Sequence, residues 1–89
     1  MKVIRVVEFA SGADCPIAGQ YLESFDFEAH DGRGFGTFTA VAARAMKFPG
    51  AAEAWAFWGT RSKTRPTRGD GKPNRPLTAT TIEIVDEQV

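Results

Sequence analysis

Three titratable residues at alternate positions have side chains that can perform acid–base chemistry or hold a metal. Asp26, Glu28 and His30 lie in a segment with strand periodicity, which would place both carboxylates and the imidazole on one face. A closed zinc site needs a full set of Cys and His ligands, whereas this chain has one residue of each type. We therefore expect a solvated strand face, with no metal and no other cofactor.

A catalytic nucleophile would depend on the same histidine. His30 is the only imidazole in the chain, and no serine stands in a Gly-x-Ser-x-Gly elbow. The sequence therefore predicts a protein that is not an enzyme and has no catalytic residues.

The strongest signal is a basic segment that can bind phosphate. Residues 61–75 carry six cations and one acid, Asp70, and so a net charge of +5 in a chain whose formal net charge is +0. The cations are Arg61, Lys63, Arg65, Arg68, Lys72 and Arg75. The rest of the chain carries −5, so the molecule is electrically polarised.

Two interpretations of this segment remain open. Each Lys or Arg that neutralises a phosphate releases a counterion, so a basic loop can follow a nucleic-acid backbone or meet an acidic protein surface. Alternatively, the loop is only solvated, and its charges pair with acidic residues of the same protein. Residues 63–76 contain three prolines and two glycines, so we expect a long surface loop that is mobile in the free protein.

A glycine-rich run precedes the third expected strand. Its spacing is not that of a dinucleotide fingerprint, and a strand follows it where a helix would be needed. Arg33-Gly34-Phe35-Gly36 matches the beginning of the RNP motif of RNA-recognition domains, but Thr37 and Ala40 stand where further aromatics belong. We expect the glycines to permit a tight hairpin.

Two tryptophans lie close together in an apolar helical stripe. A small domain needs its large aromatics in the core, which is the expected place for Trp55 and Trp58. Two Trp, seven Phe and one Tyr are nevertheless many for 89 residues. The alternative is a protein interface at these tryptophans, with a homodimer or a partner groove covering the surplus.

The elements that position these residues form one small α+β domain over residues 1–89. Strands are predicted over 2–9, 20–28, 35–39 and 77–85, and helices over 40–47, capped by Thr39, and 51–62. Tyr21, Phe25 and Phe27 define the buried face of the second strand, and Asp31-Gly32 predicts a hairpin turn after it. The order βββααβ indicates an antiparallel or mixed sheet of about four strands with two helices on one face.

The expected location is the cytoplasm. Cys15 is the only cysteine, so no internal disulfide can form and a reducing compartment is favoured. Arg5 and Glu8 interrupt the first apolar stretch before it could serve as a signal peptide, and no apolar run is long enough to cross a membrane.

The stretch from Phe35 to Trp58 resembles a pattern of small uncharacterised phage and prophage proteins. It is carried by Phe38-Thr39, Ala45-Met46-Lys47-Phe48 and Ala52-Glu53-Ala54. The resemblance implies a compact αβ fold but no agreed activity. Phage accessory proteins of this size often act by stoichiometric binding to host machinery. We therefore expect a non-catalytic accessory protein that contacts nucleic acid or a nucleoprotein through its basic loop. The alternative is an anti-defence, anti-CRISPR-like inhibitor of a host protein complex.

Overall fold

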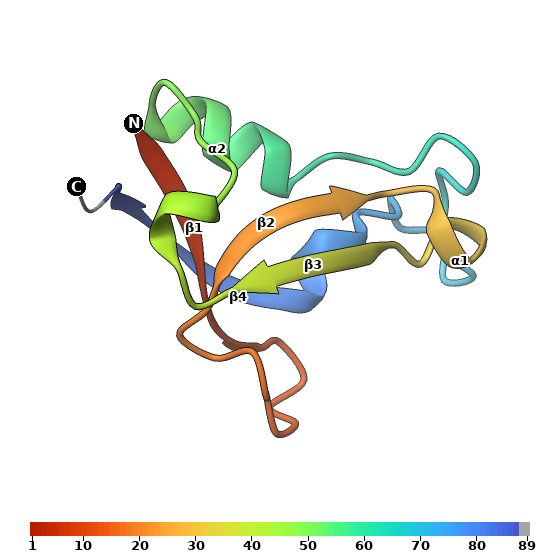
Figure 1. The fold of residues 1–89 in the computed structure, drawn as a ribbon. Helices are drawn as coiled ribbons and strands as arrows, with labels where there is room; N and C mark the ends of the chain where they lie inside the picture. The colour runs from red at the N-terminus through yellow and green to blue at the C-terminus, as the bar shows by residue number, and fades with distance from the viewer. Residues whose placement is uncertain (88–89) are drawn as a thin grey trace.

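A computed structural model describes residues 1–87, which form a small α+β structure around one antiparallel sheet (Figure 1). The strands are β1 (Lys2–Phe9), β2 (Tyr21–Asp26), β3 (Phe35–Thr39) and β4 (Thr80–Asp86). The sheet order is β3-β2-β1-β4, so β1 is central, as predicted. Two helices, α1 (Ala29–Gly32) and α2 (Ala51–Trp58), and two 3-10 turns, η1 (Ala42–Arg44) and η2 (Pro76–Ala79), complete the chain.

The first half of β1 is buried on both faces. Val3 and Ile4 point to opposite sides of the strand, yet each is at most 1% exposed. Val7, on the same face as Val3, is 44% exposed, so the predicted covering of both faces does not extend along the whole strand. The pairing with β4 shifts between Val6 and Glu8, where a bulge ends the regular ladder.

A second bulge, in β2, changes which side chains of that strand face the core, so the predicted buried face is partly wrong. Leu22 is fully buried, and Phe25 packs against the same core, although an odd spacing would place them on opposite faces of a regular strand. The register with β3 shifts between Leu22 and Ser24, which adds the residue that brings both side chains inward. Phe25 and Phe27 pack against the core and Tyr21 is not among the residues that do so, hence the predicted face is correct from Phe25 onward.

The hydrophobic core lies between the sheet and α2. Its buried members are Ile4, Leu22, Phe48, Ala54, Leu77 and Ile82. Aromatic contacts reach α2 from Phe27, which follows β2, and from Phe48: the ring centroids of Phe27 and Phe57 are 5.2 Å apart, and those of Phe48 and Phe57 are 5.4 Å apart. Most of the large aromatic content is therefore used in packing, as the size of the domain requires.

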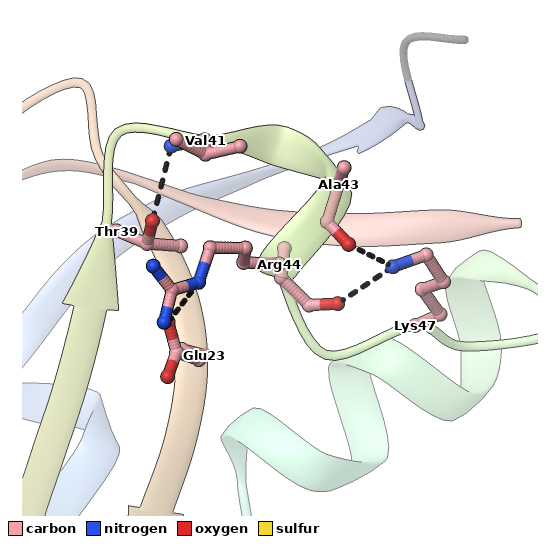
Figure 2. A network of polar contacts seen from close by, with 7 residues as sticks. Glu23, Thr39, Val41, Ala43, Arg44 and Lys47 are labelled. Atoms are coloured by element: carbon pink, nitrogen blue, oxygen red, sulfur yellow. Dashed lines mark hydrogen bonds and ion pairs between the residues drawn. The ribbon is translucent and has the colours of Figure 1, made fainter.

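The helix predicted over 40–47 does not form, and only the single turn η1 appears there. Thr39 Oγ1 does accept a hydrogen bond from the amide of Val41 at 3.0 Å, and Lys47 Nζ donates to the carbonyl of Ala43 at 2.8 Å (Figure 2). The chain then adopts an extended conformation, because the amide and the carbonyl of Phe48 both form hydrogen bonds with the backbone of Lys2, each at 2.8 Å. Pairing with the sheet overrides a weak helical preference.

Three other predicted boundaries are wrong. The strand predicted over 20–28 covers only Tyr21–Asp26. The helix predicted over 51–62 stops at Trp58 with Gly59 as its cap. Ser62 cannot continue the helix, because its hydroxyl donates to Glu28 and its amide donates to the carbonyl of Asn74. The strand predicted over 77–85 begins at Thr80. Leu77, which is 1% exposed, instead anchors η2 in the core.

The β2–β3 connection also changes the predicted order. The two strands are antiparallel, as Asp31-Gly32 predicted, but the connection contains α1, so the order is ββαβαβ and not βββααβ. His30, Asp31 and Gly32 have φ values of 53°, 60° and 83°, a left-handed turn that only glycine adopts without strain. This turn lies at the end of the hairpin, away from α2 (Figure 1), so the two helices do not share one face of the sheet.

Candidate nucleic-acid interface

The basic segment is attached to the β2–β3 connection by one carboxylate. Glu28 accepts hydrogen bonds from the Ser62 hydroxyl at 2.8 Å, from the Lys63 amide at 2.8 Å and from the Thr64 amide at 2.7 Å. The two backbone donors, Lys63 before Thr64, are the main reason that the pKa of Glu28 falls from 4.5 to about 2. The carboxylate is therefore ionised at neutral pH and holds the first residues of the segment.

Gly32 makes the second attachment. Its carbonyl accepts from Asn74 Nδ2 at 2.7 Å, and a Cβ at this position would lie only 2.5 Å from Arg65 Cβ. Gly32 is buried under the segment even though it lies in a surface turn. Both ends of the segment therefore rest on α1, as the chain following α2 shows in Figure 1.

Between these attachments the segment forms a narrow hairpin of its own. The Asn74 amide donates to the Pro66 carbonyl at 3.0 Å, and the Arg68 amide donates to the Lys72 carbonyl at 2.8 Å. Residues 63–75 contain no helix or strand, as predicted, apart from the isolated bridge between Thr67 and Pro73, whereas Pro76 already belongs to η2. Mobility of the loop stays a prediction.

All six predicted cations are exposed, and they fall into two groups. Arg65 pairs with Asp31 at 2.6 Å and Arg68 pairs with Asp70 at 2.7 Å, so part of the charge is balanced inside the protein. The other four have no acidic partner among the described residues: Arg61, Lys63, Lys72 and Arg75. Exposed ion pairs contribute little stability, so Arg65 and Arg68 can exchange their carboxylates for phosphates.

The structure adds a seventh cation that the sequence analysis did not include. Arg33 follows α1 and lines the same surface hollows as Arg68 and Asn74. The larger hollow has a volume of about 520 Å³ and is also lined by Arg75, whereas the smaller one measures about 200 Å³ and reaches Arg65. Arg33 lies far from the basic segment in the sequence, and only the packing of α1 against that segment brings them together.

The alternating acidic residues and His30 do not converge on a site. Asp26 Oδ1 accepts from the Glu28 amide at 2.9 Å, while the Glu28 carboxylate faces the basic segment. His30 lies in the left-handed turn with its ring 5.8 Å from that of Phe35. Within residues 1–87 no group of three His, Cys, Asp or Glu residues is arranged to hold a metal.

The two tryptophans separate into a core residue and a surface residue. Trp58 packs against the core and donates its indole N–H to the Thr80 carbonyl at 3.3 Å. Trp55 is 46% exposed and meets the edge of the Trp58 ring at a centroid distance of 5.5 Å. Trp58 thus contributes to packing, and Trp55 is the more exposed of the two tryptophans.

Two further findings concern membrane-spanning helices and similarity to known proteins. None of the helices within residues 1–87 has the length and apolar character needed to span a membrane. Comparison of the chain with models of known families, with curated proteins and with solved structures gives no match.

Proposed function

We propose that this chain is a non-catalytic binding protein that contacts nucleic acid, or a nucleoprotein, through the surface formed by the basic segment and Arg33. We call this surface the arginine face; it comprises Arg33, Arg61, Lys63, Arg65, Arg68, Lys72 and Arg75. The observation that carries the proposal is the larger hollow, because three arginines line it and no carboxylate does. Such a concentration of guanidinium groups suits phosphate, which arginine can bind with two parallel hydrogen bonds.

The way the segment is held also supports binding. Its two ends are fixed by Glu28 and by the Gly32 carbonyl, so much of the backbone is ordered before a partner arrives. Ordering a loop costs roughly 1 to 2 kcal/mol per residue, and a partner of this surface avoids most of that cost.

The test is the salt dependence of nucleic-acid binding. Arg33, Lys63 and Lys72 make no ion pair in the described part of the chain, so their replacement by glutamine should leave the fold intact. If these side chains meet phosphates, the triple variant lowers the slope of log affinity against log salt by about 2 to 3, since each phosphate contact contributes roughly 0.7 to 0.9.

Arg44→Gln is the matched control. Arg44 is 70% exposed and lies in η1, at the opposite end of β3 from α1 (Figures 1 and 2). Its loss should leave the slope unchanged. Equal slopes for the wild-type protein and the triple variant, or no binding at low salt, would remove the proposal.

A second function, inhibition of a host protein complex, has one observation in its favour. Trp55 is a large exposed aromatic, and tryptophan is enriched at the energetically dominant positions of protein interfaces. In this case partners isolated with the protein would survive nuclease treatment and would be lost with Trp55→Ala. Partners that vanish after nuclease treatment favour the arginine face. An origin in a phage or prophage is part of the same proposal and rests on the resemblance described above.

A further inference from the structure

The two hollows of the arginine face are neighbours of different character. They share Arg33, Arg68 and Asn74 along their common border. The residues that line the larger hollow include two apolar ones, which we call its apolar wall: Phe9, at the end of β1, and Pro76, at the start of η2. The smaller hollow has no such wall and is lined by polar and backbone groups.

The chemistry of this arrangement is that of a nucleotide. An apolar wall suits a base, which has hydrophobic faces, while guanidinium groups suit the phosphate that follows it along a strand. The volume of the larger hollow, about 520 Å³, falls within the usual range for small-molecule sites. The single carboxylate at the smaller hollow, Asp31, is already engaged by Arg65 at 2.6 Å, so it leaves Arg33 to an anion. Arg68 pairs with Asp70 at 2.7 Å, an exposed ion pair that a phosphate can replace.

An unpaired strand fits these hollows better than a duplex does. In a duplex the arginines could reach phosphates and base edges, but the faces of the bases are stacked on one another and none could lie against Phe9, which leaves the apolar wall unused. An acidic peptide would likewise use the cations and not Phe9. We propose that the larger hollow holds the base of one nucleotide of a single-stranded nucleic acid against Phe9 and that Arg33 and Arg68 hold the adjoining phosphate. This inference rests on the proposed function and specifies its substrate class.

The test compares a single strand with its abasic counterpart, which differs only in lacking the bases, and with a duplex. The wild-type protein is titrated with a short oligothymidine, with the abasic oligomer of the same length and charge, and with a duplex. Oligothymidine should bind at least about fivefold more tightly than the abasic oligomer, the lower end of what one base–aromatic stack contributes. Equal affinity for all three probes would overturn this inference and leave the proposed function standing. No binding of any probe would remove both.

Two further probes separate other sources of the same chemistry. Thymidine monophosphate should bind much more weakly than the oligomer. Equal binding would overturn the assignment to a strand in favour of a free nucleotide. Polyglutamate should not compete with the oligomer, and effective competition would assign the face to acidic proteins.

A pair of phenylalanine variants locates the base. Phe9→Leu keeps apolar volume and removes the aromatic ring, so it should reduce the preference for oligothymidine over the abasic oligomer. Phe35→Leu is the matched control, because Phe35 is 58% exposed and lines neither hollow. If only the control variant loses the preference, the placement of the base is wrong. The wild-type comparison remains decisive even if Phe9→Leu fails to fold.

Discussion

Replacing Gly32 with alanine should detach the basic segment from α1. Two costs are visible at this position: the backbone φ is 83°, and the new Cβ would lie 2.5 Å from Arg65 Cβ and 3.0 Å from Ser62 Oγ. The Arg65 Cβ is bonded directly to the backbone, so no change of rotamer can move it away. The segment itself must shift.

The two costs can be given magnitudes. A left-handed conformation costs a non-glycine residue roughly 1 to 2 kcal/mol, and inserting a methyl group into a filled space costs typically about 1 to 3 kcal/mol. Gly32→Ala should therefore destabilise the fold by about 2 to 5 kcal/mol. In a domain of this length each 1 kcal/mol lowers the melting temperature by roughly 4 to 8 °C, so a decrease of at least about 8 °C is expected.

The chain provides two controls within the basic segment that separate the costs. Gly71 has a φ of 85° but nothing within 4 Å of its Cβ position, so Gly71→Ala carries only the conformational cost. Gly69 also has open space around it and no positive φ, so Gly69→Ala should change stability by less than about 0.5 kcal/mol. In thermal unfolding, Gly32→Ala should have the lowest melting temperature, Gly71→Ala an intermediate one and Gly69→Ala the highest.

Two results would refute this reasoning. Equal melting temperatures for Gly32→Ala and Gly71→Ala would mean that the segment does not press on α1. An unchanged melting temperature for Gly32→Ala would mean that the turn is not left-handed at this residue. In either case the arginine face would lack the rigid base that brings Arg33 to the other cations.

The other predictions use contacts near the same surface. Because the pKa of Glu28 is lowered to about 2, its ionised form contributes stability above its ordinary value of 4.5, and this is lost as pH falls from there to about 2. The melting temperature of the wild-type protein should therefore exceed that of Glu28→Gln at pH 7, and the difference should disappear near pH 2. A difference that stays constant with pH would contradict the role of the carboxylate. Trp58→Phe should cost about 1 kcal/mol for the hydrogen bond to Thr80, whereas Trp55→Phe should change little; equal melting temperatures would show that the indole N–H is dispensable. Hydrogen exchange should be slow at the amides of residues 63–64 and fast at Gly69, and uniformly fast exchange would mean that the segment is not attached in solution.

Local sequence signals predicted the elements that depend on local physics. The β-branched run of β1 and the Asp-Gly turn between β2 and β3 both appear, since alternation and turn chemistry act over a few residues. The bulge that turns Leu22 inward has no such signal, because an added residue is defined only by the partner strand. The failed helix over 40–47 has the same origin, as Phe48 is drawn to Lys2 at the far end of the chain.

The sequence predicted the positive charge of the candidate site but not how its side chains are arranged. Residues 61–75 form the cationic surface as expected, yet two cations are ion-paired and Arg33 joins them from another element. Neither fact is visible in the spacing of the segment. The Arg65–Asp31 pair and the approach of Arg33 follow from Glu28 and Gly32, which read as an exposed strand residue and a turn glycine in the sequence and act as the two attachment points in the structure. The Arg68–Asp70 pair forms within the segment itself.

These attachments explain how a chain with no net charge can present a cationic face. Glu28 neutralises no arginine or lysine side chain; its carboxylate is satisfied by a hydroxyl and two backbone amides. An acid that binds the backbone fixes the segment and leaves the lysines and arginines free, whereas an acid that bound a guanidinium would remove a charge from the surface. Asp31 and Asp70 do act in that second way, but each does so through one exposed pair that a phosphate can displace. Glu28 thus serves the structure of the arginine face, and the positive charge remains available to a ligand.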